Sequence, residues 1–328
     1  MRTMNSNSRR IFLKGTLAGA ALLCAGRKTE ALAAAVEKSR VVVAHDALLR
    51  GSGSSVDPQR MLALLDRAMQ SLFGHDDAWR KLVRPGETVS LKVNALGGRG
   101  ISTNVQFVTA ICERLQQAGV KPSDIVIWDR DSNELERAGF HITMGGDRVQ
   151  CYGTDRVGYE DELAAYGSVG SRLSKILTQR SNVLINLPVL KDHDGAGVTI
   201  ALKNMYGVIH NPNKYHPNGC NPYVADLNML PEIRGKMRLN LCDATTAMYE
   251  GGPGFKPEHC WNANSLLAST DAVALDHTGW QIIERKRAEK GYKTLTAEQR
   301  SPSYIATAAD AEHRLGTNDP KMISLVEV

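Results

Sequence analysis

Aromatic side chains are scarce in this chain, and their scarcity limits the kinds of ligand to expect. They make up 5% of the 328 residues, with four tryptophans and five phenylalanines. Sugars and flavins are commonly held by stacking on aromatic rings, so the composition argues against both. A nucleotide signature is also missing, because the Gly97–Gly100 loop has the spacing of neither a dinucleotide fingerprint nor a Walker loop. That loop is open to two interpretations, contact with an anion or a flexible turn.

Long apolar runs and clustered cysteines are missing too. A membrane-spanning helix needs ~20 consecutive apolar residues, and no stretch of the sequence has that character. We therefore expect no permanent membrane anchor. The chain has six cysteines, but no two of them form a Cys-x-x-Cys pair, which excludes a zinc ribbon and a ferredoxin repeat.

Three of the cysteines allow two interpretations. Cys220, Cys242 and Cys260 lie in the polar, glycine-rich C-terminal half of the chain and could converge in the fold. Two of them would form a disulfide in an oxidising compartment, whereas all three together would ligate a cluster. The sequence leaves both alternatives open.

The first 33 residues have the pattern of a twin-arginine export signal. Arg9 and Arg10 are followed by Ile-Phe-Leu and Lys14, and then by a short, weakly apolar stretch over residues 15–25. The small-x-small sequence at residues 31–33 is typical of a cleavage site. We therefore expect the twin-arginine translocase as a partner during export and a periplasmic location for the protein. This pathway carries folded proteins, often because a cofactor has to be inserted before export. The signal therefore favours a protein with a bound metal or cofactor.

The positive charge of the chain is confined to this signal. Residues 1–33 contain six basic side chains and one acidic one, a net charge of +5 that equals the charge of the whole chain. The remaining residues are therefore formally neutral. Their charge gives no support to binding of nucleic acid or of an acidic membrane surface.

After the signal, buried strands alternate with amphipathic helices. The predicted strands cover residues 41–44, 87–93, 124–128, 183–187 and 237–241, and the predicted helices cover residues 57–74, 104–117 and 271–283. Strands separated by helices of this length favour parallel pairing. We predict one α/β domain over residues 34–328, with a largely parallel central sheet, open to mixed pairing, and helices on both faces. The apolar run at residues 322–326 either pairs as an edge strand or packs loosely.

Basic and amide side chains follow the predicted strands. Lys92 and Asn94 end the second strand, and a strand near residue 187 leads into Lys191 and His193. Ligands of open α/β sheets lie beyond the carboxyl ends of the strands, so these residues predict an anion site. Lys191 and His193 are two positions apart and share one side of an extended chain. The alternative is a solvated loop whose charges only promote solubility.

A helix start after residue 199 adds to the same site. Thr199 is predicted to cap this helix, and Lys203 and Asn204 lie one turn inside it, where the N-terminal dipole would attract an anion. We predict Lys191, His193 and Lys203 as catalytic residues, because a buried lysine or a histidine can act as a general acid or base. We predict Lys92, Asn94 and Asn204 as substrate-binding residues.

Carboxylates and a histidine offer a possible metal site. His216 lies in a turn-rich loop, Asp243 ends a strand, and Glu250 precedes a glycine-rich turn. Asp271 precedes a helix, where it is either a further ligand or an ordinary N-cap. We predict His216, Asp243, Glu250 and Asp271 as ligands of a divalent metal, with the carboxylates as acid partners of the basic residues in the alternative.

These motifs resemble the family known as domain of unknown function 362. The resemblance is carried by Lys-x-Asn at residues 92–94, Asn-Leu-Pro-x-Leu-Lys-x-His at 186–193, Lys-Asn at 203–204, Met-x-Glu-Gly-Gly-Pro at 248–253 and Ala-Ser-x-Asp-Ala-Val-Ala-Leu-Asp at 268–276. It covers about residues 40–285 and leaves residues 286–328 as an extension. The resemblance implies an α/β fold, frequent twin-arginine export and, in some members, iron–sulfur modules. This chain departs from those members because it has no cysteine repeat.

Three functions therefore remain open from the sequence. The first is a cofactor- or metal-dependent enzyme that acts on a small anionic substrate, with a divalent metal favoured over an iron–sulfur cluster. The second is a redox or accessory electron-transfer protein with a redox partner. The third is a protein that binds an anion without chemistry. The cofactor, the reaction and the oligomeric state are not determined by the sequence.

Overall fold

The computed structural model describes residues 38–74 and 77–328. Its strands are β1 (Ser39–His45), β2 (Val89–Val93), β3 (Ile125–Trp128), β4 (Gln150–Cys151), β5 (Ala164–Tyr166), β6 (Val169–Ser171), β7 (Val183–Leu187), β8 (Val189–His193), β9 (Gly197–Thr199), β10 (Met237–Met248), β11 (Cys260–Trp261), β12 (Ser265–Ser269) and β13 (Ile323–Glu327). Its α-helices are α1 (Pro58–Phe73), α2 (Ala78–Leu82), α3 (Val105–Gln117), α4 (Ser132–Ala138), α5 (Lys175–Gln179), α6 (Ala201–Asn204), α7 (Tyr223–Asn228), α8 (Pro231–Arg234), α9 (Ala272–Glu289) and α10 (Tyr304–Ala309).

A mixed sheet forms the centre of the described fold. Its main path runs in the order β13-β1-β12-β10-β7-β2-β3-β4, and β8, β9 and β11 pair beside this path. The strands from β10 to β4 pair in parallel, as does β13 with β1. Only β12 on the main path runs antiparallel to its neighbours, β1 and β10. The predicted α/β fold with a largely parallel sheet is confirmed, and mixed pairing occurs where β12 is inserted.

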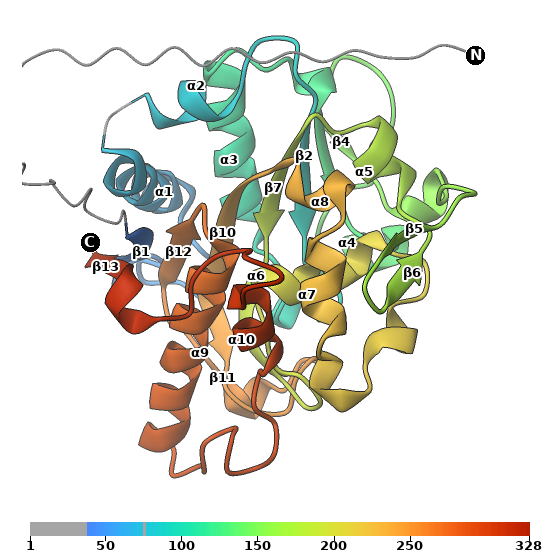
Figure 1. The fold of residues 1–328 in the computed structure, drawn as a ribbon. Coiled ribbons are helices and arrows are strands. Elements are labelled where there is room, and N and C mark those ends of the chain that lie inside the picture. The colour runs from blue at the N-terminus through green and yellow to red at the C-terminus, as the bar shows by residue number, and fades with distance from the viewer. Residues whose placement is uncertain (1–37, 75–76) are drawn as a thin grey trace, which may run out of the picture. The chain divides into compact units, whose positions relative to one another are not determined.

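Helices cover both faces of this sheet. The central strands present apolar side chains to both faces, so each face has to be buried. In β7, Val183, Ile185 and Leu187 pack in one hydrophobic core with residues of α1, α2 and α3. Leu184 of the same strand packs in a second core with residues of α6, α7, α9 and α10. Figure 1 shows α1 and α3 beside one face and α6, α9 and α10 in front of the other.

Helices α1 and α3 begin and end where the sequence predicts, and α9 begins where it predicts. The Asp57 side chain accepts a hydrogen bond from the Arg60 amide at the start of α1, Pro58 occupies the first helical position, and Gly74 ends the helix with φ of 73°. A left-handed residue at this position favours glycine, which has no Cβ to clash. Asn104 and Asp271 cap α3 and α9 by the same side-chain mechanism. The predicted helices and strands are confirmed, but α9 and β10 run six and seven residues past their predicted ends at residues 283 and 241.

The C-terminal segment is an integral part of the described fold. Helix α9 continues to Glu289, and β13 pairs in parallel with β1 from Ser39↔Ile323 to Val43↔Glu327. The apolar run at residues 322–326 therefore forms an edge strand. Residues 286–328, which the resemblance leaves as an extension, share the hydrophobic cores of the rest, for example through Tyr304 and Ile305.

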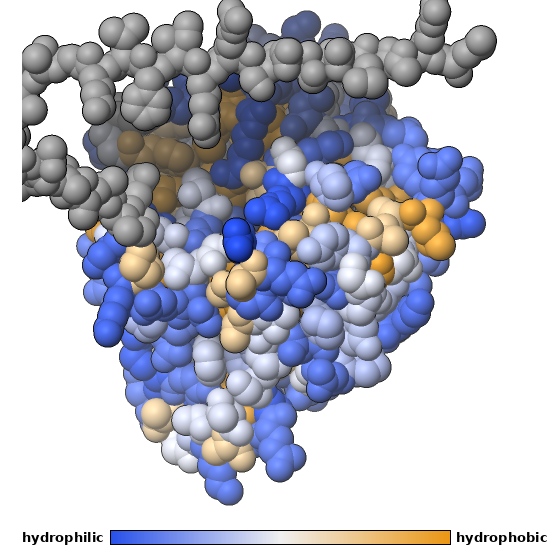
Figure 2. Space-filling view, viewed as in Figure 1, coloured by the Kyte–Doolittle hydropathy of each residue, from blue (hydrophilic) through white to orange (hydrophobic). Residues whose placement is uncertain are grey.

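The surface is mainly polar on the face shown in Figure 2, where apolar residues form only small patches. Of the helices in the described part of the chain, none has the length and apolar character needed to cross a membrane.

Candidate functional site

A cavity of about 220 Å³ opens beyond the carboxyl ends of β2, β3 and β8. It is small beside the ~300–1,000 Å³ of pockets for drug-sized ligands. Its lining includes all six side chains that the sequence predicts as catalytic or substrate-binding, together with residues of three loops. The lining residues are Lys92, Asn94, Leu96, Asp129, Arg130, Glu134, Lys191, His193, Thr199, Lys203, Asn204, Tyr206, Gly207, Pro212, Asn213, His216 and Pro253.

Lys92 is fixed as a cation by its neighbours. Its Nζ lies 2.7 Å from the Asp129 carboxylate and donates to the Val93 carbonyl at 2.6 Å. Asp129 follows β3 directly, and its second oxygen accepts from the Ala95 amide at 2.8 Å. Both side chains of this ion pair are almost fully buried. The pair spans the ends of two parallel strands and forms one wall of the cavity.

Four asparagines continue from the cavity into the sheet. The Asn94 amide donates to Asn204 Oδ1 at 3.0 Å, and Asn204 donates to Asn186 Oδ1 at 2.8 Å. Asn186 in turn donates to Asn240 Oδ1 at 2.9 Å. Each amide can donate and accept, so the chain of bonds fixes which atom of Asn94 and Asn204 faces the cavity. Asn94 presents its side-chain oxygen to Lys191 Nζ, which lies 3.0 Å away.

Lys191 lies in β8 and is completely buried. Its Nζ donates to Asn94 Oδ1 at 3.0 Å and to the Pro253 carbonyl at 3.2 Å. Within the described residues no carboxylate lies close enough to form an ion pair with it. Burial lowers the pKa of Lys191 to about 8, although Asp129 and Asp192 favour its charge from a distance.

His193 follows on the same side of β8 and is held as a neutral imidazole. Two backbone N–H groups, of Gly195 and Ala196, donate to its Nδ1 at 3.1 and 3.2 Å. The exposed Asp194 carboxylate also lies 2.9 Å from Nδ1, but the two donors make this nitrogen an acceptor and place the proton on Nε2. Burial, together with the charges of Lys203 and Lys191, lowers the pKa of His193 to about 2.

Lys203 completes the positive lining of the cavity. Its Nζ lies 3.3 Å from His216 Nε2 and 4.1 Å from the centre of the Tyr206 ring. His216 Nδ1 faces the Pro212 carbonyl at 3.1 Å, so Nδ1 carries the proton and Nε2 accepts from the lysine. Burial lowers the pKa of Lys203, and no carboxylate among the described residues forms an ion pair with it.

The helix that carries Lys203 differs from the prediction. Helix α6 has only four residues, and Thr199 does not cap it. Instead the buried Asp276 carboxylate of α9 accepts from the amides of Ala201 at 2.6 Å and Leu202 at 3.2 Å. The prediction of an anion at this N-terminus is therefore wrong, because the protein supplies its own carboxylate there.

Thr199 has a different place, in β9 at the cavity wall. Its hydroxyl is buried and has no hydrogen-bond partner among the residues that the structure describes. A buried hydroxyl without a partner costs free energy, because it has lost its bonds to water. The orphaned hydroxyl therefore points to a polar ligand in the cavity.

Behind the cavity lies a network of ion pairs, between buried and half-buried side chains, that the sequence does not predict. Arg300 Nη1 contacts Asp192 at 3.1 Å, and its Nη2 contacts Glu250 at 2.6 Å. Arg287, which is fully buried, also pairs with Glu250 and with Glu298. The Asp192 carboxylate accepts from the Gly252 amide at 2.8 Å and so anchors the loop that presents the Pro253 carbonyl to Lys191.

The structure does not bring the four predicted metal ligands together. Within the described chain, no group of three or more His, Cys, Asp or Glu side chains could hold a metal ion. Glu250 pairs with arginines, and Asp243 accepts from the Asn104 and Thr245 amides at 2.6 and 2.8 Å. Asp271 caps α9, and His216 contacts Lys203. The carboxylates have protein partners that come from distant parts of the sequence, so the prediction of one shared metal site is not supported by the geometry.

The three predicted cysteines are also not grouped as ligands. Cys220, Cys242 and Cys260 are free thiols in the described structure, so no disulfide joins them. Cys220 is buried near Lys203, Cys242 lies in β10, and Cys260 lies in β11. Burial raises the pKa of Cys260 to about 11, which disfavours the thiolate needed for ligation. Arg9 and Arg10 of the predicted signal lie outside the described residues.

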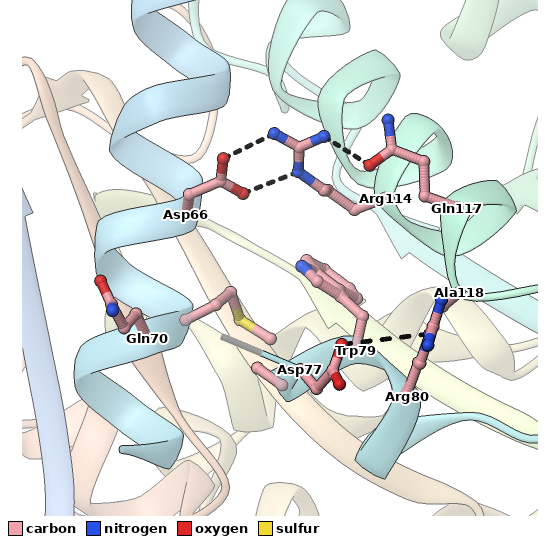
Figure 3. A pocket seen from close by; sticks show the side chains of 10 residues that line it. Asp66, Gln70, Asp77, Trp79, Arg80, Arg114, Gln117 and Ala118 are labelled. Carbon is pink, nitrogen blue, oxygen red and sulfur yellow. Dashed lines mark hydrogen bonds and ion pairs between the residues drawn. The ribbon is translucent and has the colours of Figure 1, made fainter. Parts of the chain in front are cut away.

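A second cavity, of about 390 Å³, lies between α1, α2 and α3 (Figure 3). Arg114 points across it and contacts both oxygens of Asp66 at 2.6 and 2.7 Å, while Gln117 accepts from the same guanidinium. The charges drawn there neutralise each other, whereas Lys191 and Lys203 of the first cavity have no carboxylate in ion-pair contact among the described residues. The first cavity is therefore the candidate site.

An open α/β sheet with a cavity at the carboxyl ends of its parallel strands defines the class of this protein. The chain belongs to the family described as domain of unknown function 362, whose model matches residues 89–281. That match includes every residue that lines the candidate site.

One curated relative matches over most of its length. The thylakoid-associated protein sll1697 of Synechocystis sp. is 26% identical over 272 residues, which cover 80% of this chain and 78% of the relative.

Two solved structures are similar at lower sequence identity. The lactate racemase apoprotein of Thermoanaerobacterium thermosaccharolyticum has a TM-score of 0.41 and 14% identity over 66% of this chain. A protein of Thermotoga maritima has a TM-score of 0.45 and 8% identity over 72% of this chain. The match spans 54% and 60% of these two chains, respectively. Neither similarity is close enough to support an argument about the site.

Proposed function

We propose that the protein binds a small organic or inorganic anion in the cavity and acts on it as an enzyme. The observation that carries the proposal is a pair of buried lysines, Lys191 and Lys203, that line one cavity, with no carboxylate of the described chain in ion-pair contact with either. A buried ammonium without a counterion is costly, and a bound anion removes that cost. The orphaned Thr199 hydroxyl adds a donor at the same place.

The same charges disfavour a bound cation in this cavity. His193 and His216 stack with their ring centres 5.7 Å apart and could otherwise begin a metal site. Lys203 donates to His216, however, and its charge lies beside both rings. A phosphate or carboxylate group suits these surroundings, and it can belong to a free substrate or to an organic cofactor.

The arrangement of Lys191 and His193 supports acid–base chemistry on the bound anion. Both side chains line the cavity from one face of β8, and the lowered pKa of Lys191, about 8, lets it gain or lose a proton near neutral pH. His193 presents an Nε2–H donor, which can stabilise negative charge on a substrate oxygen.

Thermal unfolding with a panel of anions tests this proposal. Sulfate, phosphate, oxalate and pyruvate are added to the full chain, with sodium chloride at matched ionic strength as the reference. We expect at least one of them to raise the Tm by an amount that grows with concentration, as a ligand specific for the folded state does. Lys191→Met and Lys203→Met should lose the shift, and the exposed control Lys121→Met should keep it. Equal shifts in all four proteins would contradict the proposal.

We further propose that the protein is exported by the twin-arginine pathway, on the evidence of Arg9, Arg10 and the segment that follows them. Replacement of both arginines by lysine keeps the charge and removes the paired-arginine motif. Cell fractionation should then find the variant in the cytoplasm and the unaltered chain in the periplasm. Export of both proteins alike would contradict the proposal.

A further inference from the structure

The three lysines of the cavity differ in what surrounds each Nζ. Lys92 forms a 2.7 Å ion pair with Asp129, which holds it as an ammonium. Lys203 lies 4.1 Å from the centre of the Tyr206 ring and donates to His216. A ring face attracts a cation and His216 Nε2 requires a donor, so both contacts favour the charged form of this lysine, against the burial that lowers its pKa.

Lys191 alone among the three has only neutral oxygens as partners. Its contacts are the Asn94 side-chain carbonyl at 3.0 Å and the Pro253 backbone carbonyl at 3.2 Å. Neither oxygen carries a charge, and the side chain is fully buried. With only neutral partners, Lys191 can lose its proton, in agreement with the fall of its pKa to about 8.

The two acceptors also decide what a neutral Lys191 presents to the cavity. A neutral amine has two N–H bonds and one lone pair. Asn94 and Pro253 take the two N–H bonds, and both acceptors are held, Asn94 by Asn204 and the Pro253 loop by Asp192. The lone pair then occupies the remaining tetrahedral position of Nζ. Because Lys191 lines the cavity, a ligand bound there can meet this lone pair.

We propose that Lys191 forms a Schiff base with the carbonyl carbon of a small 2-oxo acid whose carboxylate lies against Lys203. This inference rests on the proposed anion site and names its substrate class. The carboxylate needs a cation, and the carbonyl needs an amine that can lose its proton. The cavity supplies both, from α6 and β8, with Thr199 as a further donor for the carboxylate.

The chemistry balances without a redox partner. The Nζ lone pair attacks the carbonyl carbon, and the carbonyl oxygen takes a proton to give a carbinolamine. Nζ gives up its two protons, the hydroxyl leaves as water, and a C=N bond replaces the C=O bond. His193 can donate from Nε2 to the oxygen during attack, since it lines the same cavity.

Borohydride trapping tests the proposal with the full chain and pyruvate as the probe. Reduction converts an imine into a stable secondary amine, which peptide mass mapping locates on one lysine. We expect saturable labelling of Lys191 in the wild type. Acetone has the same carbonyl without the carboxylate and should label Lys191 about tenfold less, the effect of one modest ion contact. Labelling spread over exposed lysines, with none on Lys191, would overturn the proposal.

Variants separate this proposal from the anion site on which it rests. Lys191→Arg keeps the charge but cannot form an imine, so it should lose the label and keep its thermal stabilisation by sulfate. Lys203→Met should reduce pyruvate labelling to the level of acetone. If sulfate stabilises the wild type and pyruvate leaves Lys191 unlabelled, the Schiff base is rejected and the anion site stands. If no anion of the panel stabilises the wild type and no label forms, both are rejected. The wild-type map decides even where a variant does not fold.

Discussion

At the scale of the residue, the site shows how surroundings divide one side-chain type among several roles. Lys92, Lys191 and Lys203 line the same cavity. An aspartate neutralises the first, a ring and an imidazole hold the third, and the second meets only neutral oxygens. The three side chains are chemically identical in the sequence. Their burial and their partners in the fold give them different surroundings and therefore different roles.

The Thr199 hydroxyl offers the narrowest test at this scale. Thr199→Val removes an oxygen that has no hydrogen-bond partner in the described part of the chain. We expect the free energy of unfolding to stay within ~0.5 kcal/mol or to rise, and the affinity for a stabilising anion to fall by about 1 kcal/mol, the usual worth of a hydrogen bond. Urea unfolding and calorimetric titration measure the two quantities. In the control Thr278→Val, whose hydroxyl donates to Ala274 within α9, the affinity should not change.

The pH dependence of sulfate binding tests the charge of Lys191. Its pKa of about 8 means that the ammonium is present below pH 8 and is lost as the pH rises through that value. Sulfate does not titrate in this range, so its affinity should decline above about pH 8. Lys203 also has a lowered pKa and adds its own decline. Calorimetry of Lys191→Arg should therefore lose the part of the decline centred near pH 8; an unchanged profile would show that Lys191 does not contact the anion.

At the scale of the element, the site depends on a helix that is too short to stand alone. Helix α6 carries Lys203 and Asn204, and isolated short helices are unstable in water. Asp276 of α9 holds it by accepting from two of its first amides. Burial raises the pKa of this carboxyl to about 8, although the two amides oppose the shift.

Removal of Asp276 should therefore affect both stability and binding. Asp276→Ala orphans two buried N–H groups and leaves a gap, so we expect a loss of about 3 kcal/mol in urea unfolding. Anion affinity should also fall, because α6 positions Lys203. Asp271→Ala removes the N-cap of α9 at a distance from the cavity and should cost about 1 kcal/mol of stability with affinity unchanged. Equal affinities in the two variants would contradict the role given to Asp276.

A second element contact predicts how stability varies with pH. His313 Nε2 contacts Asp226 of α7 and its Nδ1 contacts Asp310 after α10, both at 2.9 Å. Burial alone would lower the pKa of His313, but these two carboxylates raise it above its ordinary value. The stabilisation is therefore complete below the unfolded pKa of about 6.5 and is lost as the pH rises through the higher folded pKa.

His313→Gln should remove that dependence. At pH 6 we expect the variant to be about 1.5–3 kcal/mol less stable than the wild type, the range for hydrogen bonds to charged groups. The difference should shrink as the pH is raised above the folded pKa. Urea unfolding at a series of pH values measures it. A difference that is constant with pH would mean that His313 is not an imidazolium in the folded protein.

At the scale of the whole molecule, the fold was largely predictable and the site only partly so. Capping residues such as Asp57 and Asn104 act locally, so the sequence locates α1 and α3. The rule that ligands bind beyond the carboxyl ends of parallel strands leads to Lys92, Asn94 and the residues of β8. The partners of the carboxylates were not predictable, because Glu250 and Asp192 pair with Arg287 and Arg300, far along the chain.

The same long-range pairing explains why the C-terminal segment matters to the site. Arg287 and Arg300 come from the part that the family resemblance leaves as an extension, yet they neutralise the acidic residues behind the cavity. With those carboxylates occupied, the lysines inside the cavity keep an excess of positive charge. The anion preference is thus a property of the assembled chain rather than of the central motif alone.

The most direct test of the anion site is a crystal structure of the protein grown with selenate, a small oxyanion that anomalous scattering locates without ambiguity. The account predicts an anomalous peak inside the cavity, within hydrogen-bond reach of Lys191 Nζ, Lys203 Nζ and the Thr199 hydroxyl. The same peak should be missing from crystals of Lys203→Met. A well-ordered cavity without a peak, in crystals where selenate occupies other places, would contradict the central claim.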